Sequence, residues 1–234
     1  MKKNWYLILI IYIFTYISMI SCSDNNKSID SDKKVYPSLQ GNNYYLLSMD
    51  NISKSKINDK IAQDYRPDKI NRNILIWSDS YSTNLCTDNN FYDEFQGWPS
   101  FTVGSNGWSA VAFNSSTGSN GFNFTKLDDS YTFHMAIRST SHATHAVRFL
   151  GSDGKLYGFA LGNEALEGIT PYTDFDRDGE WHEIEVPMKE LFDRGLKYDS
   201  IIPSGDMAIF YSGGVSGTRL DIDAVFFYQK NKTQ

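Results

Sequence analysis

The stretch from Tyr172 to Leu191, YTDFDRDGEWHEIEVPMKEL, decides the fold class. Its residues 181–186, WHEIEV, place Ile184 and Val186 on one side and the two glutamates on the other, and this period of two predicts a strand with one face toward a core. Pro187 has no amide hydrogen to give to a ladder, so it marks the end of the strand. Residues 188–192 then predict one short amphipathic helical turn. This succession is typical of β-sandwich domains that display ligand sites.

The acidic residues ahead of this strand also fit the spacing of a calcium-binding loop. Residues 174–185 contain Asp174, Asp176, Asp178, Gly179 and Glu185, which follow the D-x-D-x-D-G-x5-E pattern of an EF-hand. An EF-hand needs a helix on each side, whereas the preceding GITPY contains glycine and proline and the following residues alternate like a strand. We therefore predict a solvated acidic turn, with a calcium ion held by the turn oxygens alone as the alternative.

From residue 73 onward the sequence has an all-β character. Short apolar stretches rich in aromatic and β-branched residues are separated by glycine, asparagine, serine and aspartate. We predict strands at residues 73–77, 108–113, 131–138, 145–150, 155–161, 181–186, 206–211 and 219–228. This pattern predicts an all-β fold, a two-sheet β-sandwich or jelly roll with one short N-terminal helix.

The predicted N-terminal helix lies between residues 44 and 66. Ile57, Ile61 and Tyr65 are spaced four apart, Ser53 is a suitable N-cap, and Pro67 stops the helix. Residues 22–38 are polar and charged with few core formers, which predicts a flexible tether. We therefore expect a single β-sandwich domain over residues 39–234 that includes the helical segment.

Residues 1–23 have the pattern of an export signal. Lys2 and Lys3 precede an uncharged apolar run over residues 5–20, which is short for a membrane span. The tetrapeptide MISC at residues 19–22 resembles a bacterial lipoprotein box. We therefore expect residues 1–21 to be a signal peptide and Cys22 to be lipidated. An uncleaved anchor and an ordinary signal with an incidental cysteine are the alternatives.

Composition narrows the class of protein further. The formal net charge of −6 becomes −8 when residues 1–21, with their two lysines, are removed. An acidic exported protein is a poor nucleic-acid binder, so we expect no nucleic-acid partner. Only Cys86 remains beside a lipidated Cys22, so no disulfide stabilises the domain. The roughly 200 residues that remain suffice for one sizeable core.

Two segments resemble a known class of domain. DGEWHEIEVPMKEL (residues 178–191) resembles the late strand of galactose-binding-like jelly rolls, which include many carbohydrate-binding modules, and RLDIDAVFFY (residues 219–228) resembles their closing strand. With the lipoprotein box and tether, the chain is similar to surface glycan-binding lipoproteins of Bacteroidetes polysaccharide-utilisation systems. The resemblance implies capture of a polysaccharide or oligosaccharide at the outer membrane, a lipid anchor in that membrane, and other outer-membrane proteins of such a system as partners.

Aromatic side chains are the first candidates for the sugar site, because the apolar face of a pyranose stacks on a flat ring. Trp98 precedes a proline, Trp108 follows a glycine-rich turn, and Trp181 falls on the polar side of its strand. We predict these three as stacking platforms, with burial in the core as the alternative for each. Trp77, inside the apolar run NILIW, is assigned to the core.

Polar side chains supply the second set of candidates. His134 and Arg138 share one face of the strand at 131–138, and Arg148 lies nearby in the sequence. We predict a polar floor for sugar hydroxyls or uronates, with a solvated sheet face as the alternative. His142 and His145 lie three residues apart in a Ser/Thr-rich loop, which is too few ligands for a zinc site.

The last strand carries the candidate metal ligands. Asp221 and Asp223 fall on one side of it, and Asp93 approaches them if the first and last strands pair. Oxygens of all three would hold a structural calcium ion, with a pair of edge carboxylates as the alternative. No other cofactor is required.

Motifs for catalysis do not stand out. We find neither G-x-S-x-G nor H-E-x-x-H, and no pair of carboxylates has the recognisable setting of a glycosidase acid and base. The sequence therefore predicts a non-catalytic glycan-binding protein. A secreted glycoside hydrolase or lyase and a structural or adhesive surface protein that binds another protein are the alternatives.

Overall fold

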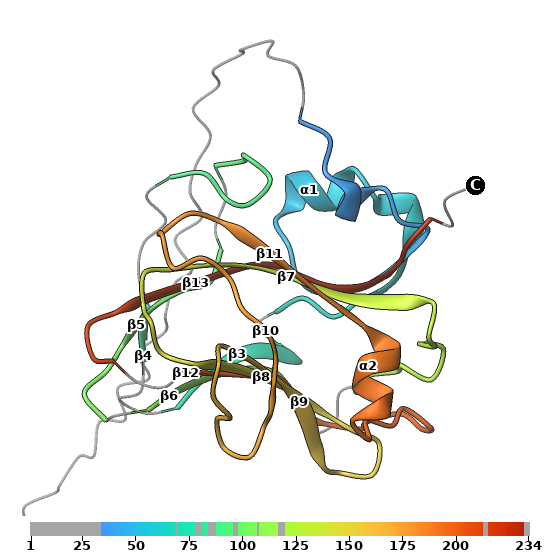
Figure 1. Ribbon diagram of the computed structural model, residues 1–234. Coiled ribbons are helices and arrows are strands. Elements are labelled where there is room, and N and C mark those ends of the chain that lie inside the picture. The colour runs from blue at the N-terminus through green and yellow to red at the C-terminus, as the bar shows by residue number, and fades with distance from the viewer. Residues whose placement is uncertain are drawn as a thin grey trace, which may run out of the picture.

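The computed structural model describes residues 34–68, 70–77, 81–83 (backbone only), 88–95, 98–106, 108–116, 120–212 and 215–231. Within these residues, two β-sheets pack face to face (Figure 1), which confirms the predicted all-β sandwich. The predictions for the signal peptide, Cys22 and residues 22–33 of the tether lie outside the described residues, as does Cys86. None of the described helices has the length and apolar character needed to cross a lipid bilayer.

Sheet A has the strand order β11-β7-β13-β1-β2. β5 pairs with β13, and β4 pairs with β5. β1 runs antiparallel to β13 and parallel to β2, so strands from the two ends of the domain lie side by side. The bounds are β1 (Asn43–Ser48), β2 (Ile61–Asp64), β4 (Tyr81–Thr83), β5 (Ser100–Val103), β7 (Tyr131–Ser139), β11 (His182–Pro187) and β13 (Arg219–Gln229).

Sheet B has the strand order β10-β9-β8-β12-β6-β3. Its neighbouring strands are antiparallel except β10 and β9, which run parallel. The bounds are β3 (Arg72–Ile76), β6 (Ser109–Ser115), β8 (His145–Leu150), β9 (Leu156–Leu161), β10 (Pro171–Thr173) and β12 (Gly205–Ser212). All eight predicted strands are confirmed to within two residues, whereas β1, β2, β4, β5 and β10 were not predicted.

The main core fills the space between the two sheets. Alternate residues of β7, Phe133, Met135 and Ile137, point into it and are buried, as their period of two predicts. The ring of Phe133 meets that of Phe149 from β8 edge-on, with centroids 4.8 Å apart. Aromatic and branched side chains from both inner faces therefore bind the sheets together.

The stretch that decides the fold behaves as its sequence predicts. Ile184 and Val186 of β11 are buried in the core, and Pro187 is the last residue of the strand. Helix α2 (Met188–Asp193) follows at once and buries its first residue and Leu191. Figure 1 shows α2 beside the end of the sandwich. The proline ends the ladder, and the short amphipathic helix then closes the core at that end.

A second hydrophobic cluster lies on the outer face of sheet A. The N-terminal segment, with the 3₁₀ turn η1 (Pro37–Leu39), α1 (Asn51–Ser55) and the 3₁₀ turn η2 (Asn58–Lys60), runs over this face in Figure 1. The buried members of the cluster are Tyr36, Leu39, Tyr44, Leu46, Met49, Ile57, Tyr92, Ala136, Ala224, Phe226 and Tyr228. Sheet A is therefore covered on both faces.

The N-terminal helix is shorter and begins earlier than predicted. Asp50, not Ser53, is the N-cap of α1, and its side chain accepts a 2.8 Å hydrogen bond from the Ser53 amide. Ile61 begins strand β2, because pairing with β1 overrides the weak helical spacing. Packing also begins before residue 39, since Tyr36 is already buried in the outer cluster.

Candidate functional site

Arg138, near the end of β7, brings together three of the side chains predicted to bind carbohydrate. Its Nε and Nη2 lie 2.8 and 2.7 Å from Oδ2 of Asp221, and its Nη1 donates to both oxygens of Asp88 at 3.0 and 3.1 Å. The guanidinium carbon lies 4.5 Å from the ring centre of Trp181 and 5.2 Å from that of Trp98. Two carboxylates and two indoles thus hold one cation in place.

The two indoles of this cluster do not form open stacking platforms. Trp98 is only 4 % exposed, and it meets Trp181 edge-to-face with ring centres 5.9 Å apart. Trp181 is half-buried, and its Nε1 donates to the carbonyl of Asn89 at 3.2 Å. Residues 88–95 fold against sheet A, where the Asn89 carbonyl contacts Trp181 and the Phe91 amide donates to Asp223. The structure therefore corrects the expectation of a free aromatic face at Trp98.

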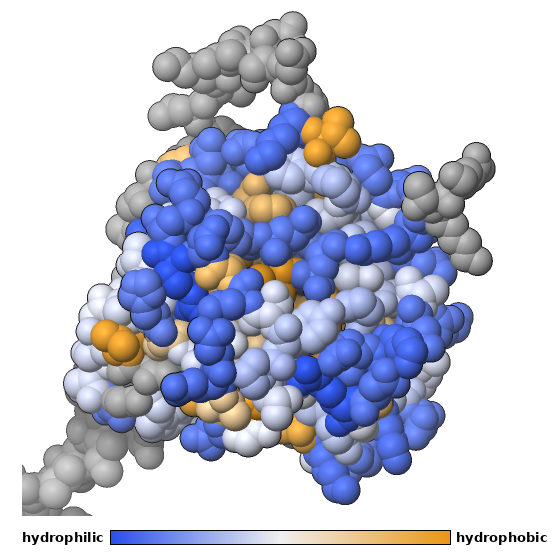
Figure 2. Space-filling view, in the orientation of Figure 1, coloured by the Kyte–Doolittle hydropathy of each residue, from blue (hydrophilic) through white to orange (hydrophobic). Residues whose placement is uncertain are grey.

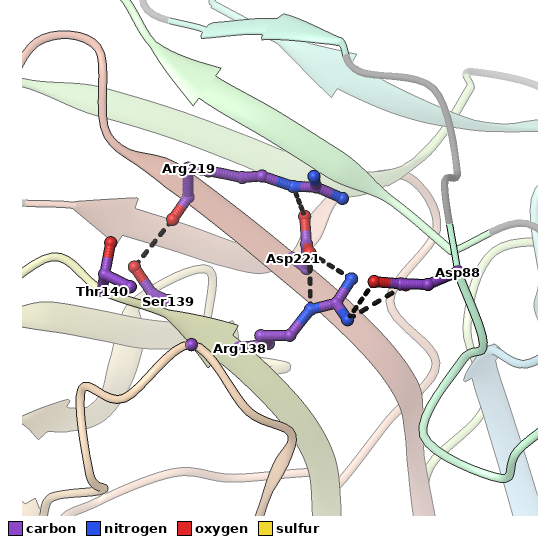
Figure 3. A pocket seen from close by; sticks show the side chains of 7 residues that line it. Asp88, Arg138, Ser139, Thr140, Arg219 and Asp221 are labelled. Carbon is purple, nitrogen blue, oxygen red and sulfur yellow. Dashed lines mark hydrogen bonds and ion pairs between the residues drawn. The ribbon is translucent and has the colours of Figure 1, made fainter.

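A polar cleft of ≈ 210 Å³ lies beside the cluster (Figure 3). Asp221, 1 % exposed, accepts from the hydroxyl of Ser100 at 2.5 Å and from Nε of Arg219 at 2.7 Å, besides its pairing with Arg138. Figure 3 shows the two arginines converging on this one carboxylate. The lining residues are Asp88, Arg138, Ser139, Thr140, Gly179, Arg219 and Asp221.

His134 does not belong to this cleft. It is fully buried, stacked on Phe226 at 4.4 Å, and its Nδ1 and Nε2 lie 2.7 Å from the Ala224 carbonyl and 2.8 Å from Oε1 of Glu183. The bond to Ala224 lies at an irregularity of β13, where this residue has a φ of +50°. The hydrogen bond from His134 holds the pKa of Glu183 below its usual value. The predicted polar floor of His134 and Arg138 is thus wrong, because the N-terminal segment buries that face of β7.

The three aspartates proposed as calcium ligands do not form a common site. Asp221 is occupied by its two arginines, and the Asp93 carboxylate accepts from the hydroxyl of Tyr36. Asp223 is buried, and burial together with the charge of Asp50 raises its pKa to about 7. Among the described residues, no group of three or more His, Cys, Asp or Glu side chains is placed to hold a metal ion. The predicted calcium site of these three carboxylates is corrected accordingly.

The acidic turn at residues 174–179 lies between β10 and β11, and two strands flank it as expected for a turn that is not an EF-hand. Asp174 pairs with Arg177 at 2.5 Å, and Asp178 pairs with His182 at 2.8 Å. Arg177 also donates to the carbonyl of Ser141 at 2.7 Å, which docks the turn on the loop after β7. Asp174 and Asp178 are therefore engaged with side chains of their own segment.

The outer face of sheet B presents aromatic rings that sequence reasoning did not select. The amide of Trp77 donates to the carbonyl of Ala110 at 3.3 Å, and Ala110 stands opposite Tyr211 on the other side. Both rings pack against the small cluster of Ala110, Ala112 and Ile209. Because neighbouring strands lie roughly 4.8 Å apart, the two rings stand about 10 Å apart across a floor of one alanine.

Polar groups border this aromatic row. Arg148 of β8 stands opposite Ile209, and its guanidinium carbon lies 4.8 Å from the ring centre of Tyr211. The same side chain donates to the carbonyl of Glu167. On the other border, Asn114 donates to Oδ1 of Asp206 at 2.6 Å. The face thus combines flat rings, a small floor, a fixed guanidinium and an amide–carboxylate pair.

Trp108 is the one predicted platform that is well exposed, at 43 %. It directly precedes β6, in which Ala110 and Ala112 face outward while Val111 and Phe113 belong to the main core. Successive side chains of a strand point to opposite faces, so continuing the alternation back by one residue places Trp108 on the same face as Ala110 and Ala112. The ring of Trp108 therefore belongs with the outer face of sheet B and not with the Arg138 cluster.

Figure 1 shows the described helices over sheet A and at the end of the sandwich, and none against the outer face of sheet B. The edge of the sandwich seen in Figure 2 is mostly hydrophilic, with scattered hydrophobic residues.

Trp77 was assigned to the core because NILIW reads as one apolar run. The signal that could have found its face is SAVAF at residues 109–113, whose two alanines fall on one side and whose Val111 and Phe113 fall on the other.

Comparison with known proteins gives likenesses in structure only. No protein-family model matches the chain, and no curated protein matches it. A family 30 carbohydrate-binding module is similar at 10 % identity with a TM-score of 0.43, over 69 % of this chain and 80 % of the module. A family 11 module from Clostridium thermocellum, in complex with a β-1,3-1,4-mixed-linked tetrasaccharide, is similar at 13 % identity with a TM-score of 0.40, over 70 % and 92 %.

A solved exo-β-agarase is also similar, at 12 % identity and a TM-score of 0.45, over 70 % of this chain. The chain spans 24 % of the agarase. At these identities the likenesses concern the arrangement of strands alone, so the functional conclusion below depends on the side chains of this protein.

Proposed function

We propose that this protein binds a glycan on the outer face of sheet B and releases it unaltered. The observation that carries the proposal is the placement of Trp77 and Tyr211 on either side of Ala110. A pyranose has a flat apolar face of C–H groups, and stacking on an aromatic ring is how protein sites hold it. Two rings with a small residue between them leave room for a sugar to lie against the sheet.

The groups around the rings supply the directional contacts. Contacts with the Tyr211 ring and the Glu167 carbonyl already restrict the rotamers of Arg148. Little further side-chain entropy is therefore lost when Arg148 donates to a sugar hydroxyl. The pair of Asn114 and Asp206 presents an amide and a carboxylate to further hydroxyls. Stacking thus supplies affinity and these polar groups orient the ring.

Binding without catalysis agrees with the carboxylates on this face. Trp77, Leu75 and Asn73 face outward from sheet B, and the strand register gives the residues that lie beside each of them on the neighbouring strands. Among these described residues, Asp206 is the one with a carboxylate. Glycoside hydrolysis needs an acid and a second carboxylate at a set separation across the bond. One carboxylate bound to Asn114 does not supply that pair.

We further propose that the protein is lipid-anchored through Cys22 in the outer membrane and works at the cell surface. The lipoprotein box at residues 19–22 and the polar residues that follow it support this localisation. Other outer-membrane proteins of a polysaccharide-utilisation system are the expected neighbours.

Affinity electrophoresis against a panel of purified polysaccharides tests the binding function. With a glycan that retards the wild type, Trp77→Ala and Tyr211→Ala should each lower affinity about tenfold or more, as loss of a central aromatic contact does. Phe95→Ala is the matched control, because Phe95 is exposed but lies on the segment that covers sheet A. Unchanged retardation in both ring variants would contradict the site. Release of reducing sugar by the wild type would show an enzyme instead.

A further inference from the structure

The polar cleft of Figure 3 holds one carboxylate that is poorly secured. Asp221 is buried and accepts from Ser100, Arg138 and Arg219, so it is a fixed part of the fold. Asp88 has a side chain that is 56 % exposed, and its ion pair in the described structure is with Arg138. An ion pair whose carboxylate is exposed to solvent is screened by water and contributes little to stability. Asp88 is therefore readily displaced from Arg138.

The charges of the cleft require a second anion. Arg138 and Arg219 bring two positive charges, and buried Asp221 neutralises one of them. Among the described residues that line the cleft, Asp88 meets the remaining charge. Nη2 of Arg219 is buried without a hydrogen-bond partner among the described residues, although its side chain is 38 % exposed as a whole. An unsatisfied guanidinium donor is costly and favours a bound acceptor.

The cleft is also shaped in advance. Trp98 and Trp181 hold the guanidinium of Arg138 from their rings, so its donors need no reorganisation. Gly179 has a φ of +86°, and a Cβ there would lie 3.2 Å from Cγ2 of Thr140 on the opposite wall. Glycine therefore keeps the cleft open at this point. Its ≈ 210 Å³ is below the roughly 300–1,000 Å³ of pockets for drug-sized ligands and suits one sugar residue.

We propose that this cleft is a second binding site, separate from the face of sheet B, and that it takes the carboxylate of a hexuronate. The ligand carboxylate displaces Asp88, accepts from Nη1 of Arg138 and from the exposed part of the Arg219 guanidinium, and takes over the charge balance that Asp88 provides now. Thr140, which lines the cleft, faces the ring hydroxyls. The reaction is an exchange of one ion pair for another, so no bond of the ligand is broken.

Titration of the ¹⁵N-labelled protein with glucuronate and galacturonate, followed by NMR, tests this site. We expect saturable shifts at Gly179 and Thr140 with the uronates and none with glucose or galactose, and weaker binding at higher ionic strength. Arg219→Gln should weaken uronate binding about tenfold through loss of a charge-assisted pair. Asp88→Asn should strengthen it, because the competing internal carboxylate is gone.

Lys189→Gln is the matched control, since it removes one positive charge at an exposed position of α2 and should leave uronate affinity as in the wild type. Equal binding of glucose and glucuronate, or uronate affinity unchanged in both Arg219→Gln and Asp88→Asn, would overturn the proposal. Trp77→Ala should bind uronate normally. A failure of the sheet-B site therefore shows in the ring variants, and a failure of this cleft shows in the Arg219 and Asp88 variants.

Discussion

At the scale of single residues, the cluster around Arg138 shows how packing changes the role of a side chain. From the sequence, Trp98, Trp181 and Arg138 were a sugar platform and its polar floor. In the fold the three contact one another, and the guanidinium lies against both rings. Through Asp88 and Asn89, these contacts also hold residues 88–95 against sheet A. What remains free for a ligand is the charged cleft beside them.

The burial of Trp98 leads to a prediction about stability. Trp98→Ala should lower the free energy of unfolding by about 3–5 kcal/mol, because it removes a large buried ring and leaves a cavity. Urea denaturation measures the change. Trp108→Ala, at an exposed ring, is the control and should stay within about 1 kcal/mol of the wild type. Equal stability of the two variants would contradict the assigned burial.

The raised pKa of Asp223 leads to a prediction about pH. Its pKa is about 7 in the folded protein against 3.8 for an ordinary aspartate, because burial and nearby Asp50 disfavour the charged form. The folded state thus binds this proton more tightly, and the contribution of Asp223 to stability falls as the pH rises from about 4 to 7. Asp223→Asn removes that dependence.

Melting temperatures at pH 5 and pH 8 check the point. The melting temperature of Asp223→Asn relative to wild type should be higher at pH 8 than at pH 5, because the amide does not ionise. Since all other titrating groups are shared, the difference between the two proteins isolates Asp223. The same offset at both pH values would show that its carboxyl is ionised throughout.

At the scale of elements, the N-terminal segment decides which face of the sandwich is open. Ile57, between α1 and η2, is completely buried in the cluster on the outer face of sheet A. Ile57→Ala should therefore cost about 2–5 kcal/mol of stability. Ile70→Ala is the matched control, because Ile70 is largely exposed and its truncation should change stability by about 0.5 kcal/mol or less. An equal effect of both changes would mean that this segment does not stabilise the sheet.

Elements with strong local patterns were predictable, and elements held by distant partners were not. The alternation of apolar and polar residues in β7 and β11, and the proline before α2, can each be recognised from a few consecutive residues of the sequence. β1 and β2 carry no such pattern, since β1 is buried on both faces between β13 and β2. Asp50 caps α1 while Asn90 donates to its other oxygen at 3.0 Å, which joins segments forty residues apart.

At the scale of the whole molecule, the N-terminal segment and the proposed glycan face lie on different sheets. The N-terminal segment runs over the outer face of sheet A (Figure 1), whereas Trp77 and Tyr211 pack against the small cluster of sheet B. Under the proposed lipid anchor, a tether that joins the domain on the sheet-A side would direct the rings away from the membrane. This arrangement suits the capture of a polymer from outside the cell.

The anchor itself is tested on the full chain. Cys22→Ala should abolish labelling with a radioactive fatty acid, because the thiol is the acceptor of the lipid in the expected box. Cys86→Ala is the control, and it should be labelled as the wild type is. Normal labelling of Cys22→Ala would reject the lipid anchor while leaving the glycan site untouched.

By itself, the sequence determined the two-sheet architecture, most of its strands and the inward residues of each, because hydropathy of period two is a local property of the chain. It did not identify the site, because each strand has a second face whose fate depends on what folds over it. The N-terminal segment and residues 88–95 bury that face on sheet A, with His134 beneath them. On the corresponding face of sheet B, Trp77 and Tyr211 are only partly buried. Only the tertiary contacts between segments far apart in the chain decide between these outcomes.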